Sequence, residues 1–471
     1  MKVEQIFTGC LAEMAYYIES NGEAAIVDPL RETQPYIDMA AADNATIKYI
    51  FLTHFHADFV SGQYDLAQKT GAKIVFGPNA TAEYDFHVGT DGEVFPLGDG
   101  KITLLHTPGH TMESSSYLIT EKDGSTPYVL TGDCLFIGDV GRPDLAVKSD
   151  LTQADLAGHL FDSLRNKIMT LPDDIIVYPN HGAGSACGKN MSSETFDTLE
   201  NQKKTNYALR ADMTKEEFIQ EVTAGLKTPP QYFPNNVRMN KSINTSIDDV
   251  LSAGTTALDA VTFKEMSEQK DVLVIDTRSK EDYTEQGTVP GAWFIGIDGS
   301  FAPWVGALVT NIQQKIIFIA DEDKVQEVAT RFSRVGYDNT AGYLKGGMDA
   351  WKKAGLDFDK IGSMSAQEFG DALAKGEMEK PTDVRKDTEY RSEHAVGVDN
   401  FPLDTIHANF SEIDTNKAYY VHCASGYRSL IAASIFMANG VKNVTDVRGG
   451  FKAMQETDMP MTDFICPTTF S

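Results

Sequence analysis

The chain has 471 residues, of which 42% are hydrophobic and 23% charged, a composition typical of folded globular proteins and not of disordered or fibrous ones. At roughly one domain per 150 residues, this length predicts about three domains. The formal net charge of −27 argues against nucleic acid or an anionic membrane as the main partner, because both carry negative charge.

The N-terminal segment contains no uninterrupted apolar stretch, and no run approaches the ~18 apolar residues of a membrane span. We therefore expect a cytoplasmic protein without a membrane partner. The cysteines are few, odd in number and widely spaced, which is typical of free thiols in a reducing compartment. They are Cys10, Cys134, Cys187, Cys423 and Cys466.

The first half of the chain alternates predicted strands with helices. Strands at 15–19 and 24–28 flank Asn21-Gly22, a strong hairpin signal, and a helix is predicted at 34–42. Apolar or β-branched runs predict further strands at 47–52, 73–76, 101–106, 116–120, 128–131 and 175–178. A helix is predicted from the end of the His54–Asp58 stretch to about residue 69, and further helices are predicted at 151–167, 192–210 and 215–224. Prolines at 229, 230 and 234 then indicate a linker.

Metal-binding residue types follow four of these predicted strands. The strand at 47–52 runs into His54, His56 and Asp58, and three later strands run into His110, Asp133 and His181. If the first strand continues through His54 and His56, alternation places both side chains on one side. Because loops at one rim of a sheet are where ligands are usually bound, the repetition predicts a metal site there.

These motifs resemble the metallo-β-lactamase superfamily in order and in context. The matching residues are His54-x-His56-x-Asp58, His110 within Thr-Pro-Gly-His-Thr, Asp133 within Thr-Gly-Asp, and His181. The resemblance implies an αββα sandwich of two sheets flanked by helices, with metal at one edge. Dinuclear hydrolases of that family have a histidine directly after the aspartate, whereas this chain has Phe59. A second metal would depend on Asp58, a bridging Asp133 and His181, so we expect one metal per chain.

Two histidines and one carboxylate suit non-haem Fe(II) with open positions for O2 and substrate. The persulfide dioxygenase branch of the superfamily is similar to this chain at His54, His110 and Asp133, which implies that these residues bind one Fe(II) per chain. By the same resemblance, His56, Asp58 and His181 surround the metal or line the substrate pocket, where they orient the ligands. The alternative for His56 and His181 is an ordinary hydrogen-bonded loop histidine.

Four further residues near this rim are candidates for substrate binding. Arg142 and Lys189 would hold the carboxylate of a thiol cofactor, and Arg238 lies in a segment that also resembles persulfide dioxygenases. Each of the three can equally be a surface ion-pair partner. Cys187, between glycines just beyond His181, is expected to be an exposed thiol that relays persulfide sulfur, whereas free cysteines are otherwise commonly buried.

The second half of the chain repeats itself after a polar connector at 241–256. Asp276-Thr-Arg278 with Tyr283 recurs as Asp383-Val-Arg385 with Tyr390, and Gly346-Gly347 recurs as Gly449-Gly450. Each copy has a central apolar strand, at 316–320 and 418–422, which precedes a helix as in a parallel sheet. The copies resemble rhodanese-like α/β domains. We therefore expect a first domain at 1–240 and rhodanese-like modules at 257–358 and 363–465.

Only the second copy has a nucleophile at the end of its central strand. Its loop, Cys423-Ala-Ser-Gly-Tyr-Arg428, opens a helix, so inward backbone N–H groups and Arg428 would stabilise a thiolate or persulfide. Cysteine-dependent phosphatases have a longer loop between cysteine and arginine, so this shorter loop favours sulfur. The first copy has Asp321 at the matching position, a poor sulfur acceptor, and we expect that copy to be an inactive spacer or docking unit.

The whole arrangement resembles the persulfide dioxygenase–sulfurtransferase fusions of bacterial sulfide detoxification. The resemblance implies oxidation of a low-molecular-weight persulfide by O2 to sulfite, with Cys423 forming or using thiosulfate. We also expect a homo-oligomer, a dimer or a tetramer. The alternatives are a dinuclear thioester hydrolase of the glyoxalase II type and a non-enzymatic sulfur carrier or regulatory protein. The identity of the thiol and the direction of transfer stay open.

Overall fold

The computed structural model describes residues 1–466 and divides into two compact units. The first unit comprises Met1–Ile247 together with Ser333–Gly336, and the second holds the remaining described residues from Asp248. Within residues 1–466, no helix has both the length and the apolar character needed to cross a membrane.

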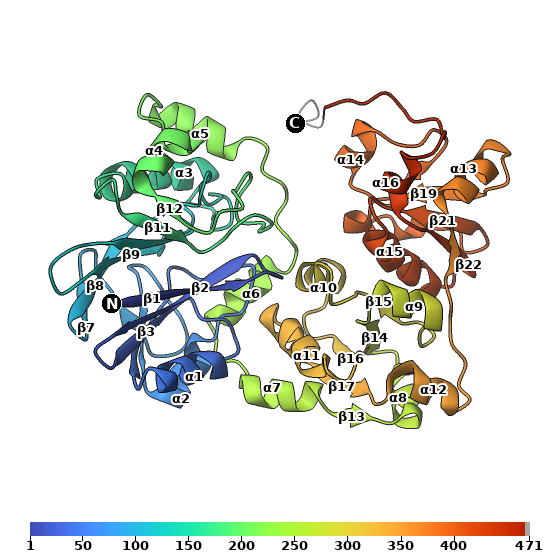
Figure 1. Cartoon of the computed structure of the whole chain (residues 1–471), viewed down its shortest axis with the longest axis horizontal. Helices are drawn as coiled ribbons and strands as arrows, with labels where there is room; N and C mark the ends of the chain where they lie inside the picture. Colours follow the sequence, from blue (N-terminus) through green and yellow to red (C-terminus); the bar gives the residue numbers. More distant parts are fainter. Residues whose placement is uncertain (467–471) are drawn as a thin grey trace. The chain divides into compact units, whose positions relative to one another are not determined.

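The first unit is a sandwich of two six-stranded sheets with helices on the outer faces (Figure 1). The first sheet has the order β1 (Lys2–Thr8), β2 (Glu13–Ser20), β3 (Glu23–Val27), β4 (Thr46–Phe51), β5 (Lys73–Phe76) and β6 (His87–Val88). The second has the order β12 (Asp197–Thr198), β11 (Ile176–Pro179), β10 (Tyr128–Gly132), β9 (Ser115–Thr120), β8 (Gly100–His106) and β7 (Val94–Leu97). The helices are α1 (Gln34–Ala42), α2 (Gln63–Thr70), α3 (Gln153–Ser163), α4 (Leu199–Thr205), α5 (Lys215–Thr223) and α6 (Phe233–Asn240).

Alternation along the strands builds three apolar layers in this unit. On β2, Tyr16 and Ile18 pack between the two sheets, whereas Ala15 and Tyr17 face the side covered by α1 and α2. The second sheet packs its outer face against α3 and α5 through residues such as Leu160. Both faces of each sheet are therefore covered, which leaves the loops at the strand ends as the place for polar side chains.

The second unit contains two five-stranded parallel sheets with equivalent strand orders, which confirms the predicted repeat. The first sheet has the order β13 (Ala257–Leu258), β17 (Thr340–Leu344), β16 (Lys315–Ile319), β14 (Val272–Asp276) and β15 (Trp293–Phe294). The second has the order β18 (Gly362–Met364), β22 (Asn443–Val447), β21 (Ala418–His422), β19 (Lys380–Asp383) and β20 (Asp399–Asn400).

Helices lie before, between and after these parallel strands, and those between strands form the crossovers that a parallel sheet requires (Figure 1). Those of the first module are α7 (Ile247–Gly254), α8 (Ala260–Ser267), α9 (Lys280–Gln286), α10 (Phe301–Leu308), α11 (Val325–Arg334) and α12 (Gly347–Lys353). Those of the second are α13 (Ala366–Ala374), α14 (Asp387–Ser392), α15 (Tyr427–Ala438) and α16 (Gly450–Met454).

Three local expectations differ from the structure. Strand β4 ends at Phe51, so His54 and His56 lie in a loop and not on a continuing strand. The predicted helix at 192–210 is helical as α4 only from Leu199, because Asp197 and Thr198 pair with β11 as strand β12 and the Thr198 hydroxyl caps the start of α4 by accepting the N–H of Asn201. The expected connector at 241–256 includes the helix α7.

Candidate metal centre and sulfur-transfer loop

The loop after β4 is held in place by two polar side chains from distant parts of the chain. Asp28, at the end of β3, accepts the backbone N–H of Thr53 at 2.8 Å. Asn240, at the end of α6, donates its side-chain amide to the carbonyl oxygens of His56 and Phe59, both at 2.8 Å. The backbone of a loop with no regular structure of its own is therefore hydrogen-bonded at several points.

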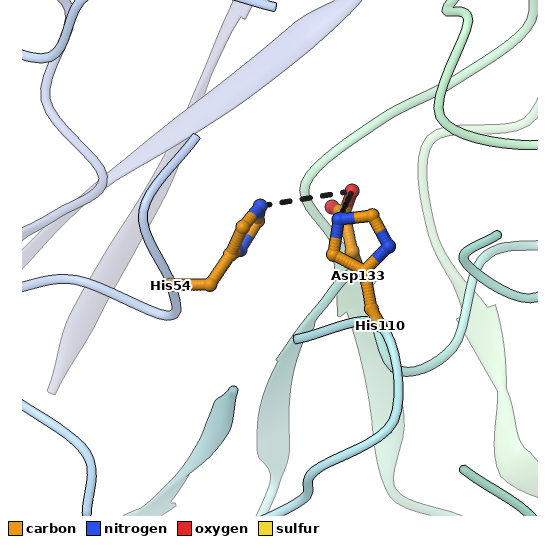
Figure 2. Close-up of side chains that lie close together, drawn as sticks. All are labelled: His54, His110 and Asp133. Carbon is orange, nitrogen blue, oxygen red and sulfur yellow. Dashed lines mark ion pairs between the residues drawn. The ribbon is translucent and has the colours of Figure 1, made fainter. Parts of the chain in front are cut away.

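His54, His110 and Asp133 come together from three loops, with the imidazoles facing the carboxylate (Figure 2). The Nε2 atoms of His110 and His54 lie 3.3 Å and 3.9 Å from Oδ2 of Asp133. All three side chains are buried, and one ligand atom of each lies within 4.8 Å of the others. The structure therefore places the three predicted iron ligands in one cluster.

The donor atoms of this cluster fit a metal ion. The Nδ1 atom of His110 donates to the carbonyl oxygen of Arg142 at 2.9 Å. The Nδ1 atom of His54 lies 2.9 Å from Oγ1 of Thr53. These contacts leave Nε2 of each ring directed to Asp133. Burial, together with the neighbouring imidazoles, lowers the pKa of His54 well below its ordinary value. Both carboxylate oxygens of Asp133 are buried with no hydrogen-bond partner among the described residues, and a cation would satisfy them.

His56, Asp58 and His181 form a second set on the other side of Asp133. The Nε2 atom of His181 lies 3.5 Å from Oδ2 of Asp58 and 3.7 Å from Oδ1 of Asp133. The Nδ1 atom of His56 and both oxygens of Asp58 are buried without a hydrogen-bond partner among the described residues. The residues expected to surround the metal are thus also able to hold a cation of their own.

Phe59 occupies the position at which the dinuclear hydrolases of the metallo-β-lactamase superfamily, which the motifs resemble, have a histidine. Its ring is fully buried and stacks on His56, with ring centroids 4.3 Å apart. The His56 ring is also held at its Nε2 atom, which lies 3.0 Å from Oδ1 of Asp28. The second set therefore has three possible ligands, and Phe59 packs against one of them without adding a fourth.

Two of the predicted substrate-binding cations are already engaged within the protein. The guanidinium of Arg142 is buried, and it donates to Asp144 at 2.6 Å and 2.7 Å and to backbone carbonyl oxygens. The ammonium of Lys189 donates to the carbonyl oxygens of Glu221 and Ala224 at the end of α5. For Arg142 the ion-pair alternative is thus present, and the binding of a substrate carboxylate by either cation stays a prediction. Arg238 is exposed on α6, and its role stays a prediction.

Cys187 was expected to be an exposed thiol, and this expectation is wrong. Its side chain is only 1% exposed, and burial together with the carboxylates of Asp58 and Asp133 raises the pKa of the thiol well above its ordinary value. The sulfur nevertheless lies within 4.8 Å of ligand atoms of Asp133 and His181. Cys134 is also buried, which raises the pKa of its thiol to about 12.

In the second unit, Cys423 follows β21 and is buried at the start of α15. The backbone N–H of Gly426 donates to its sulfur at 3.2 Å, and Gly426 has a φ of +105°, which favours glycine. The carbonyl oxygen of Cys423 accepts the N–H of Phe451 at 2.7 Å. A Cβ atom on Gly450 would lie 2.3 Å from that oxygen, so this second glycine also keeps the loop in place.

Arg428 is held by a residue that the sequence analysis did not identify. Its two terminal nitrogens donate to the two oxygens of Glu389, on α14, at 2.6 Å and 2.8 Å. This bidentate pair fixes the plane of the guanidinium next to the Cys423 loop. In the first module, the matching Asp321 is exposed, and the adjacent Glu322 accepts the N–H of Gly346 at 2.8 Å.

Comparison with known proteins identifies the domains. Residues 8–181 match the metallo-beta-lactamase superfamily, and residues 259–354 and 365–457 each match the rhodanese-like domain. The probable hydroxyacylglutathione hydrolase glo2 of Schizosaccharomyces pombe is 32% identical over 198 residues, which are 41% of this chain and 72% of that protein.

Two solved structures are also similar. A metallo-beta-lactamase from Staphylococcus aureus subsp. aureus COL is 30% identical, with a TM-score of 0.63, over 73% of this chain and 98% of that one. The crystal structure of ETHE1 from Myxococcus xanthus covers 51% of this chain and 100% of that one, with 28% identity and a TM-score of 0.42. The chain belongs to the metallo-beta-lactamase superfamily, and two rhodanese-like domains follow its metallo-beta-lactamase domain.

Proposed function

We propose that the chain is a persulfide dioxygenase fused to a sulfurtransferase that acts in sulfide detoxification. The first reaction converts RSSH, O2 and H2O into RSH, sulfite and two protons. The proposal is carried by one observation: the buried set of His54, His110 and Asp133 occurs in the same chain as a buried, amide-bound Cys423 in a rhodanese-like domain. Fe(II) bound by the first set would supply open coordination positions for O2 and for the persulfide.

The residues around that set have a defined part in this function. The Arg142 carbonyl oxygen and the Thr53 hydroxyl hold the outer ring nitrogens of His110 and His54, so the inner nitrogens are positioned before any ligand binds. Asp28 and Asn240 hold the loop that carries His54. The chain thus supplies a rigid, buried arrangement in which little reorganisation is needed on binding.

Sulfur transfer would take place in two balanced steps at Cys423. Its thiolate attacks the outer sulfur of a persulfide, which forms the enzyme persulfide and releases the thiol. Sulfite then attacks that outer sulfur, which forms thiosulfate and returns the Cys423 thiolate. The Gly426 N–H and the N-terminal end of α15 stabilise negative charge on the sulfur in both states. The same steps run backward when thiosulfate is the donor.

A second candidate function is thioester hydrolysis at a dinuclear site. Two observations favour it: the set of His56, Asp58 and His181 next to Asp133, and the 32% identity to a probable hydroxyacylglutathione hydrolase. Phe59 argues against it, because it replaces a potential ligand by a ring that stacks on His56. The two candidates differ in their metal count and in their need for oxygen.

The division of labour between the domains is tested by Cys423→Ser in the full chain. We expect thiosulfate formation from persulfide and sulfite to be abolished, while persulfide-dependent O2 uptake is retained, because Cys423 is not part of the metal-binding set. Cys466→Ser, which changes an exposed thiol, is the matched control and should retain both activities. Equal loss of both activities in Cys423→Ser would contradict the proposed division.

A further inference from the structure

Tyr427 links the sulfur-transfer loop to the first rhodanese-like module. It lies between Cys423 and Arg428 in the sequence, and its hydroxyl donates to the carbonyl oxygen of Gly296 at 2.8 Å. Gly296 follows β15, so it belongs to the module that has Asp321 in place of a cysteine. Both modules lie within the same compact unit. One residue of the active loop is therefore held by the module that lacks the nucleophile.

The first module is shaped around the Tyr427 ring. A Cβ atom on Gly299 would lie 2.2 Å from Cζ of Tyr427, so a glycine is needed for the ring to occupy this position. The Phe294 ring meets the ring of Tyr427 edge-on, with centroids 6.0 Å apart. The backbone N–H of Phe294 also donates to the hydroxyl of Ser434, on α15, at 2.8 Å. Helix α15 is thus attached to the first module at two separate points, one at its first residue, Tyr427, and one further along, at Ser434.

This attachment is next to the group that contacts the reactive sulfur. Gly426, directly before Tyr427, donates its N–H to the sulfur of Cys423. Its backbone is in the left-handed region, which other conformations of the loop would not keep. Fixing Tyr427 restricts the backbone of Gly426, because only a few torsions separate the two groups. The position of the Gly426 N–H therefore depends on a contact made outside its own module.

We propose that the first rhodanese-like module holds the sulfur-transfer loop of the second in its reactive conformation through Tyr427, and is not only a spacer. The inference rests on the proposed sulfur transfer at Cys423. Tyr427 is a positioning residue: it acts on the sulfur through the Gly426 N–H. When the anchor is removed, the N–H to sulfur hydrogen bond is less populated, so the thiolate is less stabilised.

The test uses the full chain with Tyr427→Phe, Gly299→Ala, the double variant and Tyr419→Phe. Tyr427→Phe keeps the ring and removes the one hydroxyl that reaches Gly296. Tyr419→Phe is the matched control. Tyr419 lies on β21, and its hydroxyl accepts the N–H of Asp414 at 3.0 Å, a contact within the second module. Two quantities are measured: the rate of sulfur transfer from thiosulfate to cyanide, and the pH dependence of Cys423 alkylation by iodoacetamide, with Cys423→Ser as the background.

We expect Tyr427→Phe to lower the transfer rate by about threefold to tenfold, the factor that corresponds to one hydrogen bond, and to move the alkylation midpoint to higher pH. Gly299→Ala displaces the ring and should lower the rate further. The double variant should lose no more than Gly299→Ala alone, because both changes remove the same contact. Tyr419→Phe should match the wild type in both quantities. A change in stability alone would not move the alkylation midpoint.

Wild-type rates and midpoints in both Tyr427→Phe and Gly299→Ala would overturn the proposal. So would an equal shift in Tyr419→Phe, because the effect would then not depend on the contact between the modules. A wild-type chain that transfers no sulfur would instead contradict the proposed function. The alkylation midpoints of the variants would still decide whether Tyr427 positions the loop.

Discussion

Asp28 joins three parts of the metal-binding rim through one buried carboxylate. Its Oδ1 atom lies 2.8 Å from the Thr53 N–H nitrogen and 3.0 Å from Nε2 of His56, and its Oδ2 atom accepts the side-chain amide of Asn180 at 2.7 Å. Asn180 directly precedes His181. Asp28 therefore fixes the loops that carry ligands from both sets.

We expect Asp28→Asn to weaken metal binding by about tenfold to a hundredfold, the usual effect of removing a partner that orients metal ligands. An asparagine has one acceptor oxygen where the carboxylate has two, so one of the three donors loses its partner. Metal affinity measured by chelator competition checks this expectation. Asp43→Asn, which changes a partly exposed carboxylate paired with Lys2, is the matched control. Equal affinities for Asp28→Asn and the wild type would show that Asp28 is only structural.

Glu389 has the corresponding part in the sulfur-transfer loop. We expect Glu389→Gln to lower sulfur transfer from thiosulfate to cyanide by about tenfold, because a neutral amide cannot make the bidentate ion pair that orients Arg428. Asp387→Asn is the control on the same helix, since Asp387 pairs with Arg391, at 3.6 Å, on the exposed side. If both variants transfer sulfur at the wild-type rate, the ion pair does not orient Arg428 for the reaction.

The sequence predicted a metal site at this rim because metal-binding residue types follow four apolar strands, and the resemblance to persulfide dioxygenases implied His54, His110 and Asp133 as its ligands. It did not reveal Asp28, Asn240 or Glu389, whose partners lie far away in the chain and whose residue types are common in turns and on helices. The burial of Cys187 was missed for a related reason. Flanking glycines suggest an open loop, but tertiary contacts decide whether the side chain is covered.

At the scale of single elements, strands were predicted best where apolar runs end at turn residues. Strand β5, helix α1 and strand β21 have the expected bounds. The stretch at 192–210 was predicted less well, because Asp197 and Thr198 pair with the distant strand β11 directly ahead of α4, and helix propensity does not report such contacts. The two rhodanese-like modules were recognisable because an internal repeat shows in the sequence itself.

Strand β22 carries a buried carboxyl group that makes the stability of the second unit depend on pH. Burial raises the pKa of Asp446 from an ordinary 3.8 to about 6, and Arg448 and Lys280 oppose the rise only in part. The pKa of Asp446 is higher in the folded chain than in the unfolded chain. Its contribution to the free energy of unfolding is therefore fully present below about pH 3.8 and is lost as the pH rises through 6. The shift corresponds to roughly 3 kcal/mol, of which about half is lost between pH 5 and pH 8.

We therefore expect the free energy of unfolding of the wild type to fall by about 1–2 kcal/mol relative to that of Asp446→Asn as the pH rises from 5 to 8. The asparagine does not titrate, so the variant lacks this loss. Denaturant unfolding of the second unit at both pH values measures the difference. Asp399→Asn, at an exposed position on β20, should show the same pH dependence as the wild type. Parallel curves for Asp446→Asn and the wild type would show that the carboxyl group has the same pKa in both states.

At the scale of the whole molecule, the chain combines a metal-binding sandwich with a tandem pair of rhodanese-like domains. The product proposed for the first domain, sulfite, is the acceptor proposed for Cys423. Such a fusion keeps producer and consumer of sulfite in one chain, whether sulfur moves directly or through solution. The dinuclear alternative gives the rhodanese-like domains no comparable connection with the first reaction.

A one-iron site that uses oxygen is the basis of the proposed function. It is tested most directly by purifying the full chain without air, counting bound iron and zinc, and then measuring O2 uptake with a low-molecular-weight persulfide. We expect one iron per chain and one O2 consumed for each sulfite formed. Two metal ions per chain, with thioester hydrolysis and no persulfide-dependent O2 uptake, would contradict it.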